Sequence, residues 1–218
     1  MEPEYKKLYS NRFSESEVEA KDKLWKVLCK EYLQQHIDPG STVVDIGAGQ
    51  CNFINNIEAK KKIAVDLNDE CQKYANGSVE FINSTSSEIE KFNNNSVDVV
   101  FMSNFLEHLK NVEEIYKTLN FAYQKIKDKG KVIIIQPNIK YAFKEYWDFF
   151  DHFIPLSHKS VSEALMSVGF KLEKVIDRFL PYTTKSSVPK STELLKLYLS
   201  FPLLWKLLGK QMLIIARK

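Results

Sequence analysis

The sequence predicts an α/β protein built on a mostly parallel sheet with helices on both faces. From Thr42 onward, short β-branched runs alternate with amphipathic stretches, which is the order of strand and helix in such folds. Each run is apolar on both faces, as buried parallel strands are. A Gly-x-Gly turn, Gly47 to Gly49, joins the first run to a helix. In open α/β sheets, ligands bind at the carboxyl ends of the strands, where this turn lies.

The individual elements follow from periodicity and from turn residues. An amphipathic helix is expected first, and Pro39-Gly40 ends it. Gly169 closes the last expected helix. The expected helices cover residues 18–35, 53–58, 69–75, 112–127 and 160–168, and the expected strands cover 42–46, 62–65, 79–82, 97–102, 131–136, 171–177 and 211–217.

Composition excludes several classes of protein. The chain has 218 residues, 31 of them basic and 28 acidic, a balance too even to indicate a nucleic-acid partner. Cys29, Cys51 and Cys71 have no ligand spacing, so neither a disulfide framework nor a metal site is expected. We expect reduced thiols and a cytoplasmic location. No apolar run is long enough to span a membrane.

The glycine turn is the most informative stretch, because the whole chain contains only seven glycines. Without Cβ atoms, Gly47 and Gly49 let a ligand approach the main chain. Asp45 precedes the turn, where its carboxylate can order the loop or accept a bond from a cationic ligand. Asp66 follows at the end of the next strand, about 21 residues later. A carboxylate there is placed to accept both ribose hydroxyls of a nucleoside.

This stretch resembles the first motif of the class I S-adenosylmethionine-dependent methyltransferases, acid-x-Gly-x-Gly-x-Gly, with Cys51 at the third glycine position. A nicotinamide site would instead have a third glycine where Asn52 stands. The resemblance implies S-adenosyl-L-methionine as cofactor. It also implies a doubly wound seven-stranded sheet of order 3-2-1-4-5-7-6 with the last strand antiparallel.

A second stretch carries the same resemblance. Residues 96–109 look like the family's strand-four signature, with Asp98 opening the strand and Glu107-His108-Leu109 just past its end. Glu107 and His108 are interpreted either as capping the loop or as functional groups, and neither is named as a base. The cofactor-binding set that the resemblance implies is Asp45, Gly47, Ala48, Gly49, Asp66, Leu67, Ser84, Thr85, Ser103, Asn104 and Leu106. Ser84 and Thr85 stand where many relatives carry an acid that binds the adenine amino group.

The acceptor side is expected after strand five, in the aromatic segment 146–153. Methyl transfer to a hydroxyl benefits from a general base, and His152 is the natural candidate near neutral pH. Asp151 or Asp148 would orient it. Alternatively, the aromatic side chains only pack a lid against the sheet. We expect O-methylation of a small-molecule, saccharide or lipid-linked hydroxyl. N- or C-methylation, or a non-catalytic binding subunit, are the alternatives.

Two further features bear on partners and organisation. Residues 193–208 are expected to form a strongly apolar helix, which indicates burial, a homodimer contact or a weak membrane-surface contact. Arg178, Tyr182 and Lys185 form either an anion site or part of an ordinary surface loop. We expect one domain over residues 1–218, in which a helical cap (1–40) is followed by a cofactor-binding half (42–138) and by an acceptor-side insertion with the C-terminal strands (139–218).

Overall fold

The computed structural model describes residues 15–86, 92–182 and 191–218, and these form a seven-stranded sheet of order β3-β2-β1-β4-β5-β7-β6. Strands β1 to β5 pair in parallel, and β7 is antiparallel to both of its neighbours, β5 and β6. The predicted order and the antiparallel last strand are therefore confirmed. The strands are β1 (Thr42–Ile46), β2 (Lys61–Asp66), β3 (Val79–Asn83), β4 (Val97–Ser103), β5 (Ile126–Pro137), β6 (Lys171–Leu180) and β7 (Gln211–Arg217).

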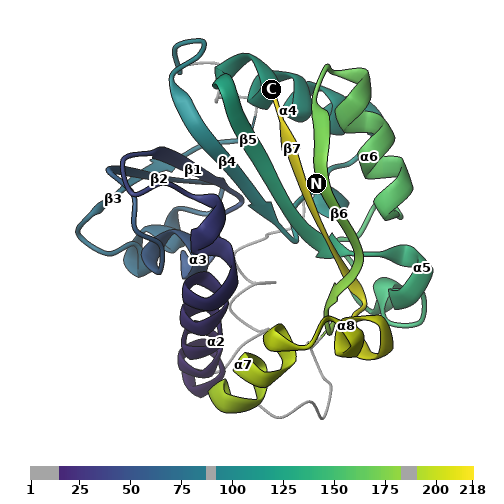
Figure 1. Ribbon diagram of the computed structural model, residues 1–218. Helices are drawn as coiled ribbons and strands as arrows, with labels where there is room; N and C mark the ends of the chain where they lie inside the picture. The colour runs from purple at the N-terminus through teal and green to yellow at the C-terminus, as the bar shows by residue number, and fades with distance from the viewer. Residues whose placement is uncertain (1–14, 87–91, 183–190) are drawn as a thin grey trace.

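Helices connect the strands and cover both faces of the sheet (Figure 1). The α-helices are α2 (Glu15–Leu28), α3 (Asn52–Asn55), α4 (Val112–Lys125), α5 (Ile139–Ala142), α6 (His158–Ser167), α7 (Thr192–Ser200) and α8 (Pro202–Leu208). Shorter helical turns are η1 (Cys29–Leu33), η2 (Gln34–His36), η3 (Asp69–Tyr74), η5 (Leu106–His108) and η6 (Tyr146–Asp148). The first predicted helix is thus real, but it ends in a π-turn and a 3-10 turn rather than as one α-helix.

The two faces of the sheet hold separate hydrophobic cores. On one face α4 and α6 contribute Leu119 and Leu165, both fully buried. On the other face α2, α3 and α8 contribute Leu28, Ile54 and Trp205, all buried. Because each side of the strands packs against helices, the strands need apolar residues at successive positions, as the sequence shows.

Local differences from the predicted boundaries have simple causes. β5 begins at Ile126 rather than near residue 131, and its pairing with β4 shifts register between Val97 and Val99. Lys129 adopts φ 66° within that irregular part, so the residues before the predicted start form an irregular extension of the strand. α6 begins at His158, two residues before the predicted start, because a reciprocal capping box between Ser157 and Ser160 sets its first turn.

The apolar segment 193–208 is not one helix buried all round. It divides into α7 and α8 because Pro202 starts a new helix. The inner face is core: the Tyr198 hydroxyl donates to the Phe179 carbonyl at 2.7 Å, and the Trp205 indole donates to the Tyr198 carbonyl at 2.9 Å. The outer face exposes five leucines: Leu194, Leu197, Leu203, Leu207 and Leu208. A homodimer or membrane contact through this outer face stays a prediction.

Three smaller predictions also have outcomes. Cys29, Cys51 and Cys71 are free and buried, in agreement with the absence of a disulfide framework. Arg178 donates to the carbonyls of Gly209 and Leu207, so its guanidinium fixes the end of α8. Lys185, its proposed anion-binding neighbour, lies outside the described residues. Within the described ranges, no helix is both long and apolar enough to cross a membrane.

Candidate functional site

The glycine turn after β1 adopts left-handed backbone at alternate positions. Gly47 has φ 69° and Gly49 has φ 51°, and Cys51 continues the pattern with φ 56°. The amides of Gly47 and Ala48 donate to the Val65 carbonyl at 2.9 and 3.2 Å, which fixes the turn against the end of β2. A cysteine in this conformation costs about 1–2 kcal/mol more than a glycine would. Gly49 faces open space, since a Cβ built there meets nothing within 4 Å.

Asp66, at the end of β2, binds the same turn from the other side. Its Oδ2 accepts from the Gly49 amide at 2.8 Å, and its Oδ1 accepts from the Asn68 amide at 2.8 Å. The Cys71 side chain also hydrogen-bonds to Asp66. A carboxylate has about four acceptor positions, so capacity remains for a hydroxyl donor. The predicted partnership between the glycine turn and the second-strand acid is therefore a direct contact.

Asp45 has a structural position rather than an exposed one. Its side chain is buried, and burial raises its pKa well above the usual value, with the nearby Asp66 charge acting in the same direction. A backbone hydrogen bond from Ile54 acts against that rise by favouring the charged form. Asp45 therefore links β1 to α3 beneath the turn. Of the two roles considered for Asp45, this position supports ordering the loop over accepting a bond from a cationic ligand.

Ser84 lies beside Asp66 at the end of β3. Its amide donates to the Asp66 carbonyl at 2.9 Å, and its buried hydroxyl oxygen has no hydrogen-bond partner among the described residues. Thr85 and Leu67 are exposed next to it. The neighbouring ends of β2 and β3 thus bring Leu67, Ser84 and Thr85 to the same edge of the sheet as the glycine turn.

The end of β4 places Ser103 and Asn104 at this edge too. Asn104 is exposed, with φ 48°, and its amide donates to the Ile135 carbonyl at 2.9 Å. Leu106, also expected here, has its side chain fully buried in the core. Its contact with the cofactor stays a prediction.

Phe105 is a neighbour of the turn that the sequence analysis did not identify. A Cβ built on Gly47 would lie 2.5 Å from the Phe105 Cδ2 atom, so the ring occupies the place of the missing side chain. The glycine at position 47 is therefore required both by its backbone angle and by this close approach.

Replacing Gly47 by alanine should destabilise the fold more than the same change at Gly49. Both positions carry left-handed backbone, which costs about 1–2 kcal/mol for a residue with a side chain. Only Gly47→Ala also forces the Phe105 ring to move, at a further cost of about 1–3 kcal/mol. Urea unfolding of the two variants measures the difference. Gly77→Ala, in open space without a positive φ, is the control; equal losses at positions 47 and 49 would refute the packing argument.

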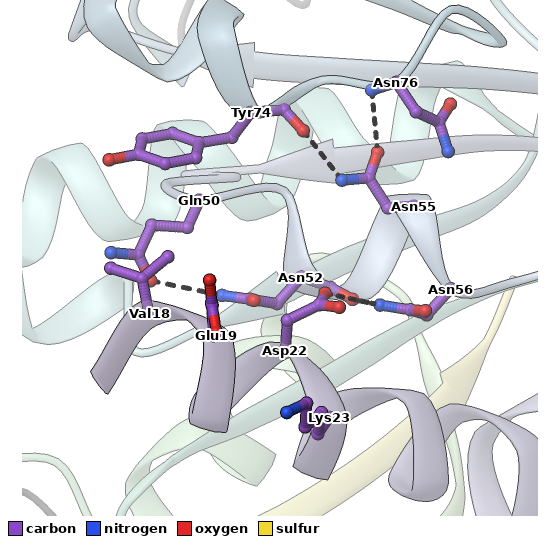
Figure 2. Close-up of a pocket in the computed structure, with 10 residues that line it drawn as sticks. All are labelled: Val18, Glu19, Asp22, Lys23, Gln50, Asn52, Asn55, Asn56, Tyr74 and Asn76. Carbon is purple, nitrogen blue, oxygen red and sulfur yellow. Dashed lines mark hydrogen bonds between the residues drawn. The ribbon is translucent and has the colours of Figure 1, made fainter. Parts of the chain in front are cut away.

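A pocket of about 470 Å³ lies beside the turn, between α2 and α3 (Figure 2). Its polar side chains largely bind one another: Asn56 donates to Asp22 at 2.9 Å, and Asn55 donates to the Tyr74 carbonyl at 2.8 Å. Gln50 brings the pocket to the edge of the glycine turn. The first bond joins α2 to the segment after α3, and the second joins α3 to η3.

A second cluster of chemical groups forms just past β4. Glu107 and His108 belong to η5, and Asp151 and His152 come from the loop between η6 and α6. The His108 Nδ1 atom lies 3.2 Å from Asp151 Oδ2 and 2.9 Å from the Asp151 carbonyl oxygen. The rings of His108 and His152 meet edge to face with centroids 4.9 Å apart. The predicted acceptor-side residues His152 and Asp151 therefore lie together with Glu107 and His108, whose role the sequence left open.

Aromatic side chains frame this cluster. Tyr146 meets His152 edge to face with centroids 4.8 Å apart, and Phe149 stacks on His152 at 4.9 Å. The loop is held over η5 because the Phe153 amide donates to the Glu107 carbonyl at 2.9 Å. Phe150 is 79% exposed, so not every aromatic side chain of segment 146–153 packs around the cluster.

Two groups inside the cluster have shifted pKa values. Burial raises the pKa of Glu107, and both of its carboxylate oxygens lack a hydrogen-bond partner among the described residues. Burial alone lowers the pKa of His108, but its hydrogen bond to Asp151 and the charges of Glu107 and Asp151 outweigh burial, so the pKa is raised overall. Potential ligand atoms of Glu107, His108 and His152 all lie within 4.8 Å of one another. Shifted groups gathered in this way mark functional sites.

Comparison with known proteins agrees with this geometry. The model of a family described as methyltransferase domain matches residues 19–175. The chain belongs to this methyltransferase family. None of the curated protein sequences matches it.

Solved structures show that the fold is that of the S-adenosylmethionine-dependent methyltransferases. One, a SAM-dependent methyltransferase from Archaeoglobus fulgidus, has 22% identity and a TM-score of 0.68, over 90% of this chain and 94% of that one. A Thermotoga maritima protein described as a possible histamine N-methyltransferase has 16% identity and a TM-score of 0.64, over 99% of this chain and 94% of that one. The third is a Haloferax volcanii complex between the activator Trm112 and a protein described as a methyltransferase. It has 14% identity and a TM-score of 0.66, over 93% of this chain and 94% of that one.

Proposed function

We propose that this methyltransferase transfers a methyl group to a hydroxyl oxygen of a small-molecule, saccharide or lipid-linked acceptor. S-adenosylmethionine is the cofactor of this family and fold. The observation that carries the hydroxyl assignment is the buried histidine and glutamate cluster immediately after β4, at the carboxyl edge of the sheet. A hydroxyl must lose a proton when it is methylated, and this cluster holds groups that can receive or promote that loss.

The cofactor fits the turn on three observations. There is open space over Gly49, Asp66 keeps acceptor capacity for a ribose hydroxyl, and the buried Ser84 hydroxyl lacks a partner within the described ranges. We propose that Ala48, Leu67 and Thr85 line the adenosine part. We also propose that Ser103 and Asn104 line the methionine part. When bound, S-adenosylmethionine supplies a methyl carbon activated by its positive sulfonium.

The chain's own residues orient the acceptor and move its proton. The acceptor oxygen forms a bond to the methyl carbon while the carbon–sulfur electron pair stays on sulfur. Without a cation in the cluster, His152 receives the hydroxyl proton, as the sequence analysis proposed. Asp151, assigned there to orient His152, has its carboxylate against the His108 ring, so it also positions the second imidazole. The stacked Phe149 and the buried Tyr146 restrict water around His152.

Two further observations bear on the acceptor, and they favour different candidates. The exposed outer leucines of α7 and α8, with Lys206 beside them, favour a lipid-linked acceptor within the hydroxyl class, because such a face can lie against acyl chains. Transfer to an amine is the second candidate. It is favoured by the fold shared with the Thermotoga maritima protein, whose description names histamine N-methylation.

A labelled-methyl assay tests the proposal. The protein is incubated with S-adenosylmethionine carrying a deuterated methyl group, together with panels of saccharides, lipid-linked saccharides, small alcohols and small amines. We expect mass spectrometry to place the label on an oxygen. A label placed on nitrogen or carbon would contradict the hydroxyl assignment while leaving the family assignment intact.

A further inference from the structure

We propose that Glu107, His108 and His152 bind a divalent transition-metal cation next to the acceptor position. The three residues come from two segments that meet only in the folded chain, η5 and the loop before α6. One carboxylate and two imidazoles form the donor set. Such sets bind zinc, iron and related first-row cations and leave coordination positions open for water or substrate. Magnesium and calcium are disfavoured, because they prefer all-oxygen ligands.

The distances suit a shared cation. The candidate ligand atoms all lie within 4.8 Å of one another. A cation held about 2.1 Å from each ligand keeps its ligands no more than about 4.2 Å apart. The largest separation therefore exceeds this limit by only about 0.6 Å.

The contacts of His108 leave one nitrogen available for the cation. Its Nδ1 atom lies 2.9 Å from the backbone carbonyl oxygen of Asp151, and a carbonyl oxygen can only accept a hydrogen bond. Nδ1 therefore carries a hydrogen, and Nε2 can present a lone pair. An imidazole held in this way by an oxygen on its far side is the usual arrangement of a metal-binding histidine. The Asp151 carboxylate lies on the same side, with its Oδ2 atom 3.2 Å from Nδ1. That side chain is then a positioning group that fixes the ring.

Glu107 is the independent observation that points to a ligand. Its side chain is 0% exposed, and neither carboxylate oxygen has a hydrogen-bond partner in the described part of the chain. Burying a carboxylate without a partner is strongly unfavourable, and buried charges in proteins are paired or coordinate metals. A divalent cation between Glu107 and the two imidazoles satisfies both oxygens and the ring nitrogens together. The partly exposed His108, with 20% of its side chain accessible, gives solvent access to the cluster.

The chemical role of the cation rests on the proposed function, although the binding site does not. A cation here polarises the acceptor hydroxyl and lowers its pKa, which makes the oxygen a better nucleophile at neutral pH. The imidazoles are then ligands rather than bases, so the hydroxyl proton passes to water. The methyl carbon still forms its bond to oxygen, and the electron pair of the broken bond still stays on sulfur.

Titration of the full-length protein with cobalt(II) tests the site directly. The protein is first treated with a chelator, and the visible absorption of bound cobalt is then recorded. We expect one cobalt per chain. Glu107→Gln should weaken cobalt binding by more than about 100-fold, and Asp151→Asn should weaken it by about 10- to 100-fold. Glu113→Gln, an exposed acid on α4, is the matched control and should bind as the wild type does.

Parallel titration with S-adenosylhomocysteine separates the possible failures. It should bind Glu107→Gln with wild-type affinity, which also shows that the variant is folded. If wild-type protein binds no cobalt, or if Glu107→Gln binds it unchanged, the metal site is wrong. If the metal site is wrong but hydroxyl methylation persists in the presence of chelator, the proposed function stands without a metal. If cobalt binds as expected but no hydroxyl is methylated, the site stands and the proposed function fails.

Discussion

Replacing Asp66 by alanine should weaken S-adenosylhomocysteine binding by about 1–3 kcal/mol, which is roughly 5- to 150-fold in Kd. The change removes the acceptor proposed for the ribose hydroxyls. It also leaves the Gly49 amide without the Oδ2 atom that accepts from it at 2.8 Å, so the turn itself loses order. Isothermal titration calorimetry measures the affinity directly.

A neighbouring acid provides the control for this change. Glu70 lies in η3, four residues further along, and its carboxylate pairs with Lys73 at 3.7 Å in an exposed, weak contact. Glu70→Ala should therefore bind S-adenosylhomocysteine as the wild type does. Equal affinities for Asp66→Ala and wild type would show that the β2 carboxylate does not contact the cofactor.

Replacing His152 by alanine should lower kcat for hydroxyl methylation, assayed in chelator so that the cluster holds no cation, by about 10²- to 10⁴-fold, the usual contribution of a positioned acid–base group. The affinity for S-adenosylhomocysteine should not change, because His152 belongs to the cluster after β4 and not to the glycine turn. Steady-state kinetics on an acceptor found in the labelled-methyl assay, with calorimetry beside it, gives both quantities.

The matched control is His36→Ala, because His36 lies in η2, at the end of the first helical segment and far along the chain from the cluster. It should keep the wild-type kcat. Unchanged turnover in His152→Ala would remove this histidine from the reaction. A loss of turnover accompanied by an equal loss of cofactor affinity would instead point to damage to the fold.

The sheet and the cofactor turn could be predicted because their signals are local. Each buried strand repeats apolar residues over a few positions, and the glycine turn lies directly after the first of them. Even the acid at position 66 follows from chain spacing, since adjacent parallel strands end at one edge. The predictions failed where several residues jointly set a boundary, as in the π-turn at Cys29–Leu33 and the break at Pro202.

The cluster after β4 could not be predicted in full, because it depends on contacts between distant segments. His108 and Asp151 are 43 residues apart, and only the folded loop brings them together. The sequence identified His152 and Asp151 from their aromatic surroundings, but it left Glu107 and His108 between a capping role and a functional one. It gave no metal requirement, because the donor atoms have no ligand spacing along the chain. Their burial and their mutual distances are properties of the fold.

The most direct test of the account is calorimetric titration of the wild-type protein with S-adenosylhomocysteine and, separately, with NADH. The open space over Gly49 and the contact between Asp66 and the turn both favour a nucleoside-containing ligand. Asn52, at the position of a third glycine, is unfavourable for a dinucleotide. We predict one S-adenosylhomocysteine bound per chain and no measurable binding of NADH. Absence of S-adenosylhomocysteine binding, or tighter binding of NADH, would contradict the account.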